Sequence, residues 1–281
     1  MKGWQLTERN IGLAPFGLSC GQLPVYSGPL KPPAGARITG VRIVGNLDLS
    51  AGDIIVERSC IKPTSGDNRA LVSNDICGPV DCLVTSPLGI TIRDSEFDAS
   101  DIPASQIAAS CAFRGVGTLQ RNYIHGMGSG ICFFGTGFLL SGLAEQNYVT
   151  GLRAAGSSHN EAATIRDLVA TQVSGRTVRF INNRLNCETG NDTGGLFIQP
   201  TWDDIANVYV EGNYIEGCGY NLFLNQAGGT YRNTHSVNNR FRPTGWGPST
   251  VMGGPGWTEW SENYIYDPGQ IDGKGRVVVA S

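Results

Sequence analysis

Four residues with acid–base side chains cluster in the middle of the sequence. His159 and Glu161 come directly before the segment 163–167 (ATIRD), Arg166 lies inside it, and Asp192 precedes the similar segment 195–199 (GLFIQ). Carboxylates, histidine and arginine are the groups that move protons and stabilise charge when a glycosidic bond is cleaved. If the two segments are neighbouring strands about 4.8 Å apart, Glu161 and Asp192 should lie about 5–8 Å from each other. The spacing therefore predicts a candidate catalytic site.

The same four residues also have a structural interpretation. All but Arg166 lie in loops just before strands, where they could cap turns, and Asp192 could make an Asx-type turn. A glycoside hydrolase needs two carboxylates in separate roles, one as acid and one as base or nucleophile. The sequence contains no compact acidic cluster, which favours binding over cleavage. Turn capping and catalysis remain alternatives at this point.

A second set of side chains is suited to binding a sugar. In short apolar segments with a period of two, alternate residues face opposite sides of a strand. This alternation predicts outward side chains at Phe134, Thr164, Arg166, Phe197, Gln199, Phe223 and Asn225. Trp202 and Trp246 lie in adjoining loops. Aromatic faces that stack on sugars, combined with a few amides, are typical of a carbohydrate site, and a row of outward aromatics is unusual without a ligand.

Several other functions have no support in the sequence. A formal net charge of −3 and the lack of a dense Lys/Arg run argue against nucleic-acid binding. There is no Walker, dinucleotide-binding, G-x-S-x-G or H-E-x-x-H motif, and no tight C-x-x-C pair, so we expect no cofactor and no metal. The most apolar segment, 130–144, is broken by glycine, whereas a membrane helix needs about 20 apolar residues. We therefore expect no membrane insertion.

The elements that position these side chains are marked by an internal repeat. Eight segments share an alternating apolar pattern that ends with a small polar residue, a variable residue and an apolar one. They recur every 24 to 36 residues, and their polar positions are Ser59, Ser95, Asn122, Asn147, Asn183, Asn213, Asn239 and Asn263. The period-two alternation indicates strands, and Asn and Gly suit the bend that follows because both tolerate left-handed backbone angles. We expect the asparagines to stack as a ladder along one edge.

Short strands at this period, without an amphipathic helix pattern, predict an all-β parallel β-helix of about eight to ten coils. A second strand family between the corners has inward residues that fill the core. They are Ile131, Phe133, Ile165, Leu196, Ile198, Leu222 and Leu224. Residues 1–37, which include LPVYSGPLKPPAGA, are interpreted as an irregular N-terminal cap over the first coil, because an open solenoid end exposes strand edges. The solenoid domain is then 38–281.

The corner repeats over roughly 38–267 resemble the right-handed parallel β-helix superfamily of pectate lyases, polygalacturonases and phage tailspikes. The segments 158–167 (SHNEAATIRD), 190–200 (GNDTGGLFIQP), 210–224 and 253–268 are also similar to β-helix proteins of actinobacteria and their phages. The resemblance implies a right-handed winding. It does not select one activity, since the superfamily contains lyases, hydrolases, epimerases and non-catalytic adhesins. Its lyases use an Arg or Lys base, and its hydrolases use two or three Asp.

The eight cysteines favour disulfides over free buried thiols. Cys77 and Cys82 flank a short Gly-Pro loop, and we also expect pairs Cys111–Cys132 and Cys187–Cys218, which occupy similar places on successive coils. Disulfides indicate an extracellular or virion-surface protein. The N-terminus MKGWQLTERN lacks the apolar core of a signal peptide, so either a signal was removed or the secretory route was not used.

Two hypotheses follow. In the first, the protein is a phage minor tail or tailspike-type protein that recognises, and in one version cleaves, a bacterial cell-surface polysaccharide. Its other partners would be further copies of itself or other tail proteins. In the second, it is a secreted polysaccharide lyase or glycoside hydrolase. Both place the glycan on the face with the outward aromatics, beside His159, Glu161 and Asp192.

Overall fold

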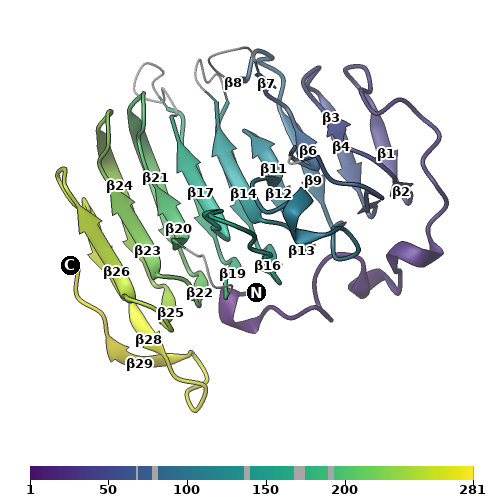
Figure 1. Cartoon of the computed structure of the whole chain (residues 1–281). Coiled ribbons are helices and arrows are strands. Elements are labelled where there is room, and N and C mark those ends of the chain that lie inside the picture. The colour runs from purple at the N-terminus through teal and green to yellow at the C-terminus, as the bar shows by residue number, and fades with distance from the viewer. Residues whose placement is uncertain (68, 78–81, 136–139, 168–174, 189–192, 281) are drawn as a thin grey trace.

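The computed structural model describes residues 1–67, 69–77, 82–135, 140–167, 175–188 and 193–280. Within these ranges the chain consists mainly of short strands in three long parallel sheets, and the strands of each sheet stack along one axis to form an all-β solenoid (Figure 1). The regular helical structure of the described residues is confined to short 3-10 turns, η1 (Gly3–Gln5), η2 (Ala14–Phe16), η3 (Cys20–Gln22) and η4 (Ala104–Gln106). The predicted all-β parallel architecture is confirmed.

The chain visits the three sheets in turn. The described strands of sheet B are β1 (Arg37–Thr39), β4 (Ile54–Glu57), β9 (Ile90–Arg93), β12 (Thr118–Gln120), β15 (Gly142–Glu145), β18 (Val178–Ile181), β21 (Ile205–Glu211), β24 (Tyr231–Val237) and β27 (Glu259–Ser261). Those of sheet A are β2 (Arg42–Ile43), β5 (Cys60–Ile61), β10 (Glu96–Asp98), β13 (Tyr123–His125), β16 (Tyr148–Thr150), β19 (Arg184–Asn186), β22 (Tyr214–Glu216), β25 (Arg240–Arg242) and β28 (Tyr264–Tyr266). β29 (Lys274–Val277) pairs antiparallel with β28 at the C-terminal edge.

The third parallel sheet is sheet C. Its described strands are β3 (Leu47–Asp48), β6 (Val72–Ser73), β11 (Cys111–Gly115), β14 (Ser129–Phe134), β17 (Ala163–Arg166), β20 (Gly194–Ile198), β23 (Tyr220–Asn225) and β26 (Gly247–Met252). A small hairpin, β7 (Ile76–Cys77) with β8 (Cys82–Leu83), projects from the solenoid near β6 (Figure 1). The parallel pairings of β14, β17, β20 and β23 align side chains of equivalent positions in rows along the axis.

The core lies between the three sheets. Every residue predicted to face inward from the second strand family is fully buried: Ile131, Phe133, Ile165, Leu196, Ile198, Leu222 and Leu224. Sheets A and B supply the facing layers, for example Phe180 of β18 and Ile215 of β22. Each coil covers the apolar residues of the coil before it, so burial continues along the whole solenoid.

Each sequence repeat spans two strands rather than one. The apolar run forms a strand of sheet B, the chain turns, and the apolar residue after the polar position starts a strand of sheet A. The left-handed backbone angle falls on the residue before the ladder position, as at Arg121, Gln146 and Asn238, with φ of 53°, 54° and 55°. An Asn or Gly occupies this bend at Asn182, Gly212 and Asn238, as expected, whereas the ladder asparagines that follow have no positive φ.

The asparagine ladder is confirmed. Asn122, Asn147, Asn183, Asn213, Asn239 and Asn263 are buried, and the Nδ2 of each of the first five donates to the Oδ1 of the next at 2.9–3.0 Å, while Asn263 Nδ2 donates to Ser236 O. The same Oδ1 atoms accept the preceding ladder residue's main-chain N–H, as between Asn183 and Asn213 at 2.8 Å. Ser95 continues the row, since its N–H donates to Asn122 Oδ1. The ladder satisfies the polar groups that a sharp buried corner would leave unpaired.

The N-terminal residues extend well beyond a cap over the first coil. Residues 24–36 bond to the first strands of the sheets, as in the 2.8 Å bond from Tyr26 N to Arg42 O. Residues 1–23, which we call the N-terminal strap, run along sheet A towards the C-terminal coils, so that the N-terminus lies near β19 (Figure 1). Gly3 N donates to Gly212 O at 3.0 Å, and a Cβ at Gly3 would lie 2.2 Å from Asn183 O. Only glycine permits this approach.

All eight cysteines are paired. The three predicted disulfides, Cys77–Cys82, Cys111–Cys132 and Cys187–Cys218, are present, and the fourth joins Cys20 of the strap to Cys60 of β5. Cys111 is opposite Ser129 and Cys132 is opposite Arg114, so their disulfide crosses diagonally instead of joining directly stacked positions. Four disulfides are typical of an extracellular protein. Among the described residues, no helix is long and apolar enough to cross a bilayer.

Candidate functional site

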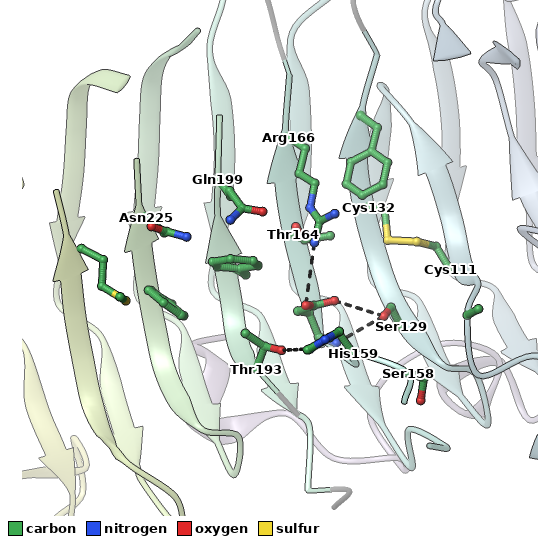
Figure 2. Close-up of a pocket in the computed structure, with 16 residues that line it drawn as sticks. Cys111, Ser129, Cys132, Ser158, His159, Thr164, Arg166, Thr193, Gln199 and Asn225 are labelled. Atoms are coloured by element: carbon green, nitrogen blue, oxygen red, sulfur yellow. Dashed lines mark hydrogen bonds and ion pairs between the residues drawn. A yellow bond between two sulfur atoms is a disulfide. The ribbon is translucent and has the colours of Figure 1, made fainter. Parts of the chain in front are cut away.

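A groove of about 590 Å³ lies on the outer face of sheet C. It extends from β11 to β26 and is rimmed on one side by the loop that precedes β17 (Figure 2). The residues that line it are Ala109, Cys111, Ser129, Cys132, Phe134, Ser158, His159, Glu161, Thr164, Arg166, Thr193, Phe197, Gln199, Phe223, Asn225 and Met252. A concave surface with apolar walls and a few convergent polar groups is the usual form of a ligand site.

The groove brings together most of the residues singled out from the sequence. The acid–base candidates His159, Glu161 and Arg166 line it. So do the sugar-binding candidates Phe134, Phe197, Gln199, Phe223 and Asn225. Asp192 lies outside the described residues, so its predicted distance from Glu161 is not tested. Trp202 and Trp246 do not line the groove, and their exposed fractions of 76% and 65% place them on open surface.

Asn160 fixes the loop that carries the acid–base residues. Its buried amide donates to the carbonyl oxygens of Ala108 and Gly128, at 3.0 and 2.7 Å, and its Oδ1 accepts from Ser158 Oγ at 2.9 Å. These bonds join the loop to the preceding coils. The residues on either side of Asn160, His159 and Glu161, are thereby directed to the groove.

Glu161 is the buried carboxyl of the groove, with an exposed fraction of 4%. Ser129 Oγ donates to its Oε2 at 3.4 Å, while its Oε1 has no hydrogen-bond partner and lies 4.0 Å from Arg166 Nη2. Burial raises the pKa of the Glu161 carboxyl above its ordinary value, even though the charges of Arg166 and His159 and the Ser129 bond act in the opposite direction. Desolvation therefore outweighs the neighbouring cation.

Arg166 is held between aromatic rings. Its guanidinium carbon lies 5.6 Å from the centre of the Phe134 ring and 5.7 Å from that of Phe197, which are cation–π distances. Phe134 is directly opposite Arg166 in the β14–β17 pairing. The flat apolar walls thus hold the cation over the groove without a close carboxylate bond.

His159 and Thr193 join two coils at the rim of the groove. Nδ1 of His159 lies 3.0 Å from Thr193 Oγ1, and Figure 2 shows the pair below Arg166. Among the described residues, no protein group is hydrogen-bonded to Nε2 of His159. A histidine held by one nitrogen can present the second to a ligand hydroxyl or to a proton in transfer.

The outward phenylalanines are less exposed than the sequence suggests. Phe197 and Phe223 have exposed fractions of 5% and 6%, because their rings pack on each other at 4.7 Å and are flanked by neighbouring side chains. Tyr220 packs edge-on against Phe223 at 5.5 Å and against Trp246 at 5.4 Å. Trp246 therefore lies outside the groove but contacts its aromatic row through Tyr220, which was not among the residues predicted from the sequence.

Two further residues line the groove, Thr164 and Ser129. Strand alternation predicted the outward position of Thr164, and nothing in the sequence predicted a role for Ser129. Thr164 was assigned an outward position, and its Oγ1 is buried in the groove wall without a hydrogen-bond partner. Ser129, the partner of Glu161, gave no signal in the sequence, because a serine at the start of an apolar strand is common. The disulfide Cys111–Cys132 also lines the groove, where it supplies an apolar surface.

Two groups of potential metal ligands exist among the described residues, and neither is in the groove. One contains Asp75 with Cys77 and Cys82, and the other contains Cys20 with Glu96 and Asp98. The sulfur atoms in both are part of disulfides and cannot act as thiolate ligands. Among the described residues that line the groove, the ionisable groups are the carboxyl of Glu161, the guanidinium of Arg166 and the imidazole of His159.

Glu161 is the one carboxyl among the described residues that line the groove. A hydrolase with two carboxylates would need a second one nearby. Among the described residues, the groove therefore presents one carboxyl, whose Oε1 lies 4.0 Å from Nη2 of Arg166.

Comparisons of the chain with protein-family models, with curated proteins and with solved structures find no match.

Proposed function

We propose that this protein recognises a complex bacterial cell-surface polysaccharide with the groove on sheet C, as a minor tail or tailspike-type protein on a phage virion. The observation that carries the proposal is the meeting of aromatic rings, amide side chains, the buried carboxyl of Glu161 and the partly exposed guanidinium of Arg166 in one groove of about 590 Å³. Sugars present apolar faces and many hydroxyls, and this combination of groups matches both.

The shape of the groove supports an extended ligand. It spans strands β11 to β26 along the axis, and equivalent positions of neighbouring coils recur at about the 4.8 Å spacing of paired strands. Gln199 and Asn225 therefore offer amides to successive parts of a polymer. We also infer that the sheets wind as a right-handed β-helix of about eight to ten coils, and that further copies or other tail proteins are its partners.

Cleavage of the bound polysaccharide is the alternative, as in a secreted lyase or hydrolase. One observation favours it, since a general acid must retain its proton near neutral pH and burial raises the pKa of Glu161. In that case Glu161 would protonate the leaving oxygen, while Arg166 would stabilise charge and His159 would transfer a proton.

The test is equilibrium binding to polysaccharide released from actinobacterial cell walls. Gln199→Ala and Asn225→Ala remove half-buried amides from the groove, and each should weaken binding about fivefold or more through the loss of one or two hydrogen bonds. Arg179→Ala, on the outer face of sheet B, is the matched control and should bind normally. Full affinity in both groove variants would place the site elsewhere. New reducing ends or unsaturated sugars during incubation, absent with Glu161→Gln, would select the cleavage alternative.

A further inference from the structure

Three polar atoms on one wall of the groove are buried and have no hydrogen-bond partner among the described residues. They are Oε1 of Glu161, Oγ1 of Thr164 and Nε of Arg166. The side chains of Glu161 and Thr164 are almost fully buried, and all three residues line the groove. In Figure 2 the side chains of Thr164 and Arg166 lie together above Ser129. Unpaired buried polar atoms are rare in folded proteins, so their grouping at a groove indicates a ligand that completes them.

We propose that this wall recognises an anionic substituent of the glycan, and that Glu161 takes up a proton as the anion binds. The inference rests on the proposed function and specifies which feature of the polysaccharide the groove reads. In the bound state Arg166 donates through Nε, Thr164 donates its hydroxyl, and protonated Glu161 donates from Oε1. Three convergent donors of this kind match an oxyanion, whereas a neutral hydroxyl could not satisfy all of them.

The charge balance of the wall explains why Glu161 takes up a proton when the anion binds. With Glu161 ionised, the pair Glu161–Arg166 is neutral before the ligand arrives, and an added anion would leave one uncompensated negative charge in a buried place. With Glu161 protonated, the anion pairs with Arg166 and the site is neutral. Burying an unpaired charge is costly, so the anion binds the protonated form better and its binding draws in a proton.

The free protein is already prepared for this step. Desolvation raises the pKa of the Glu161 carboxyl, as described above, so less free energy is needed to keep the proton. The charged groups that face Glu161 among the described residues are Arg166 on β17 and His159 in the preceding loop; Ser129 on β14 faces it without a charge. Protonation of His159 would also favour an anion, and a test must therefore separate the two residues.

The shared chemistry of the ligand is a pair of anionic oxygens, which either a sugar carboxylate or a phosphodiester can supply. The probe is the actinobacterial cell-wall polysaccharide used above, in three forms: native, carboxyl-reduced to the primary alcohol, and treated with cold hydrofluoric acid to remove phosphodiesters. We expect one of the two treatments to weaken binding at least tenfold, and that treatment identifies the anion. If the native material binds and neither treatment weakens it, this inference is wrong while the proposed function stands. If the native material does not bind, both are overturned.

Proton uptake is tested by measuring the affinity for native material from pH 8 to pH 5. Wild-type affinity should rise as the pH falls, by up to about tenfold per pH unit, the limit for one linked proton. Glu161→Gln keeps a neutral donor and should bind tightly with little pH dependence. His159→Gln should retain the wild-type dependence. Proton uptake by Glu161 would be overturned if the wild-type affinity did not change with pH. It would also be overturned if the affinity of Glu161→Gln depended strongly on pH while that of His159→Gln did not.

Discussion

Oε1 of Glu161 lies 4.0 Å from Nη2 of Arg166, beyond hydrogen-bond reach, in a wall where neither Oε1 of Glu161 nor Nε of Arg166 has another partner. A carboxyl and a guanidinium on one strand and its preceding loop normally close to a short charge-assisted pair. Here the guanidinium of Arg166 instead lies at cation–π distances from the rings of Phe134 and Phe197. The gap leaves Oε1 of Glu161 and Nε of Arg166 without a hydrogen bond to any described residue in the wall of the groove.

The buried carboxyl of Glu161 should make stability depend on pH. Because its pKa is raised in the folded protein, its contribution is fully present below the unfolded pKa of about 4.3 and is lost as the pH rises through the folded value. Glu161→Gln removes this ionisation. The melting temperature of the variant relative to wild type should therefore increase from pH 4 to pH 8. A difference that does not change with pH would contradict the desolvation of this carboxyl.

Breaking the asparagine ladder in its middle should destabilise the solenoid. Asn213→Ala removes an amide that donates to Asn239 and Phe180 O and accepts from Asn183. The buried groups left unpaired should cost about 1–3 kcal/mol, measured by denaturant unfolding. Gln270→Ala, at an exposed turn, is the control and should be close to wild type. Equal stability of the two variants would show that the ladder contributes little.

The disulfide framework predicts the number of reactive thiols. A thiol reagent should detect no free thiol in the denatured, unreduced protein and eight free thiols after reduction. Replacing Cys111 and Cys132 together by serine should lower stability by about 2–5 kcal/mol, as for other native disulfides. It should also widen the apolar wall of the groove that the disulfide lines. Eight reactive thiols before reduction would contradict the framework.

The N-terminal strap should stabilise the C-terminal coils through Trp4. Its ring lies 4.4 Å from the guanidinium carbon of Arg240, which is buried, hydrogen-bonded to main-chain oxygens such as Asp272 O, and stacked on Tyr264. Trp4→Ala should lose this contact and lower stability by about 1–2 kcal/mol. Phe16→Ala, at an exposed position of the strap, provides the control. A melting temperature equal to that of the control would mean that the strap is not anchored there.

Much of the fold could be predicted because its information is local and periodic. The Asn corners recur in the sequence, and alternation in segments such as 195–199 separates the core residue Leu196 from the groove residue Phe197. The rows of outward residues that line the groove followed from the same alternation, since residues of equivalent register must form rows on the outer face. Cys187 and Cys218 could be paired for the same reason, because they occupy similar places on successive coils.

What the sequence could not give depends on contacts between coils and loops. Phe197 and Phe223 pack on each other, so their near-complete burial is a property of the row and not of either segment. Trp246 reaches the aromatic row only through Tyr220. The path of the strap is fixed by single contacts, such as that of Gly3 with the Asn183 corner, which leave no periodic signal.

The most direct measurement of the central claim is a crystal structure of the protein with bound fragments of actinobacterial cell-wall polysaccharide. Our account predicts density for sugar in the groove on sheet C between Phe134 and Met252, with an anionic group beside Arg166, Thr164 and Glu161. Sugar density bound over sheet A or sheet B, with this groove filled only by solvent, would contradict it.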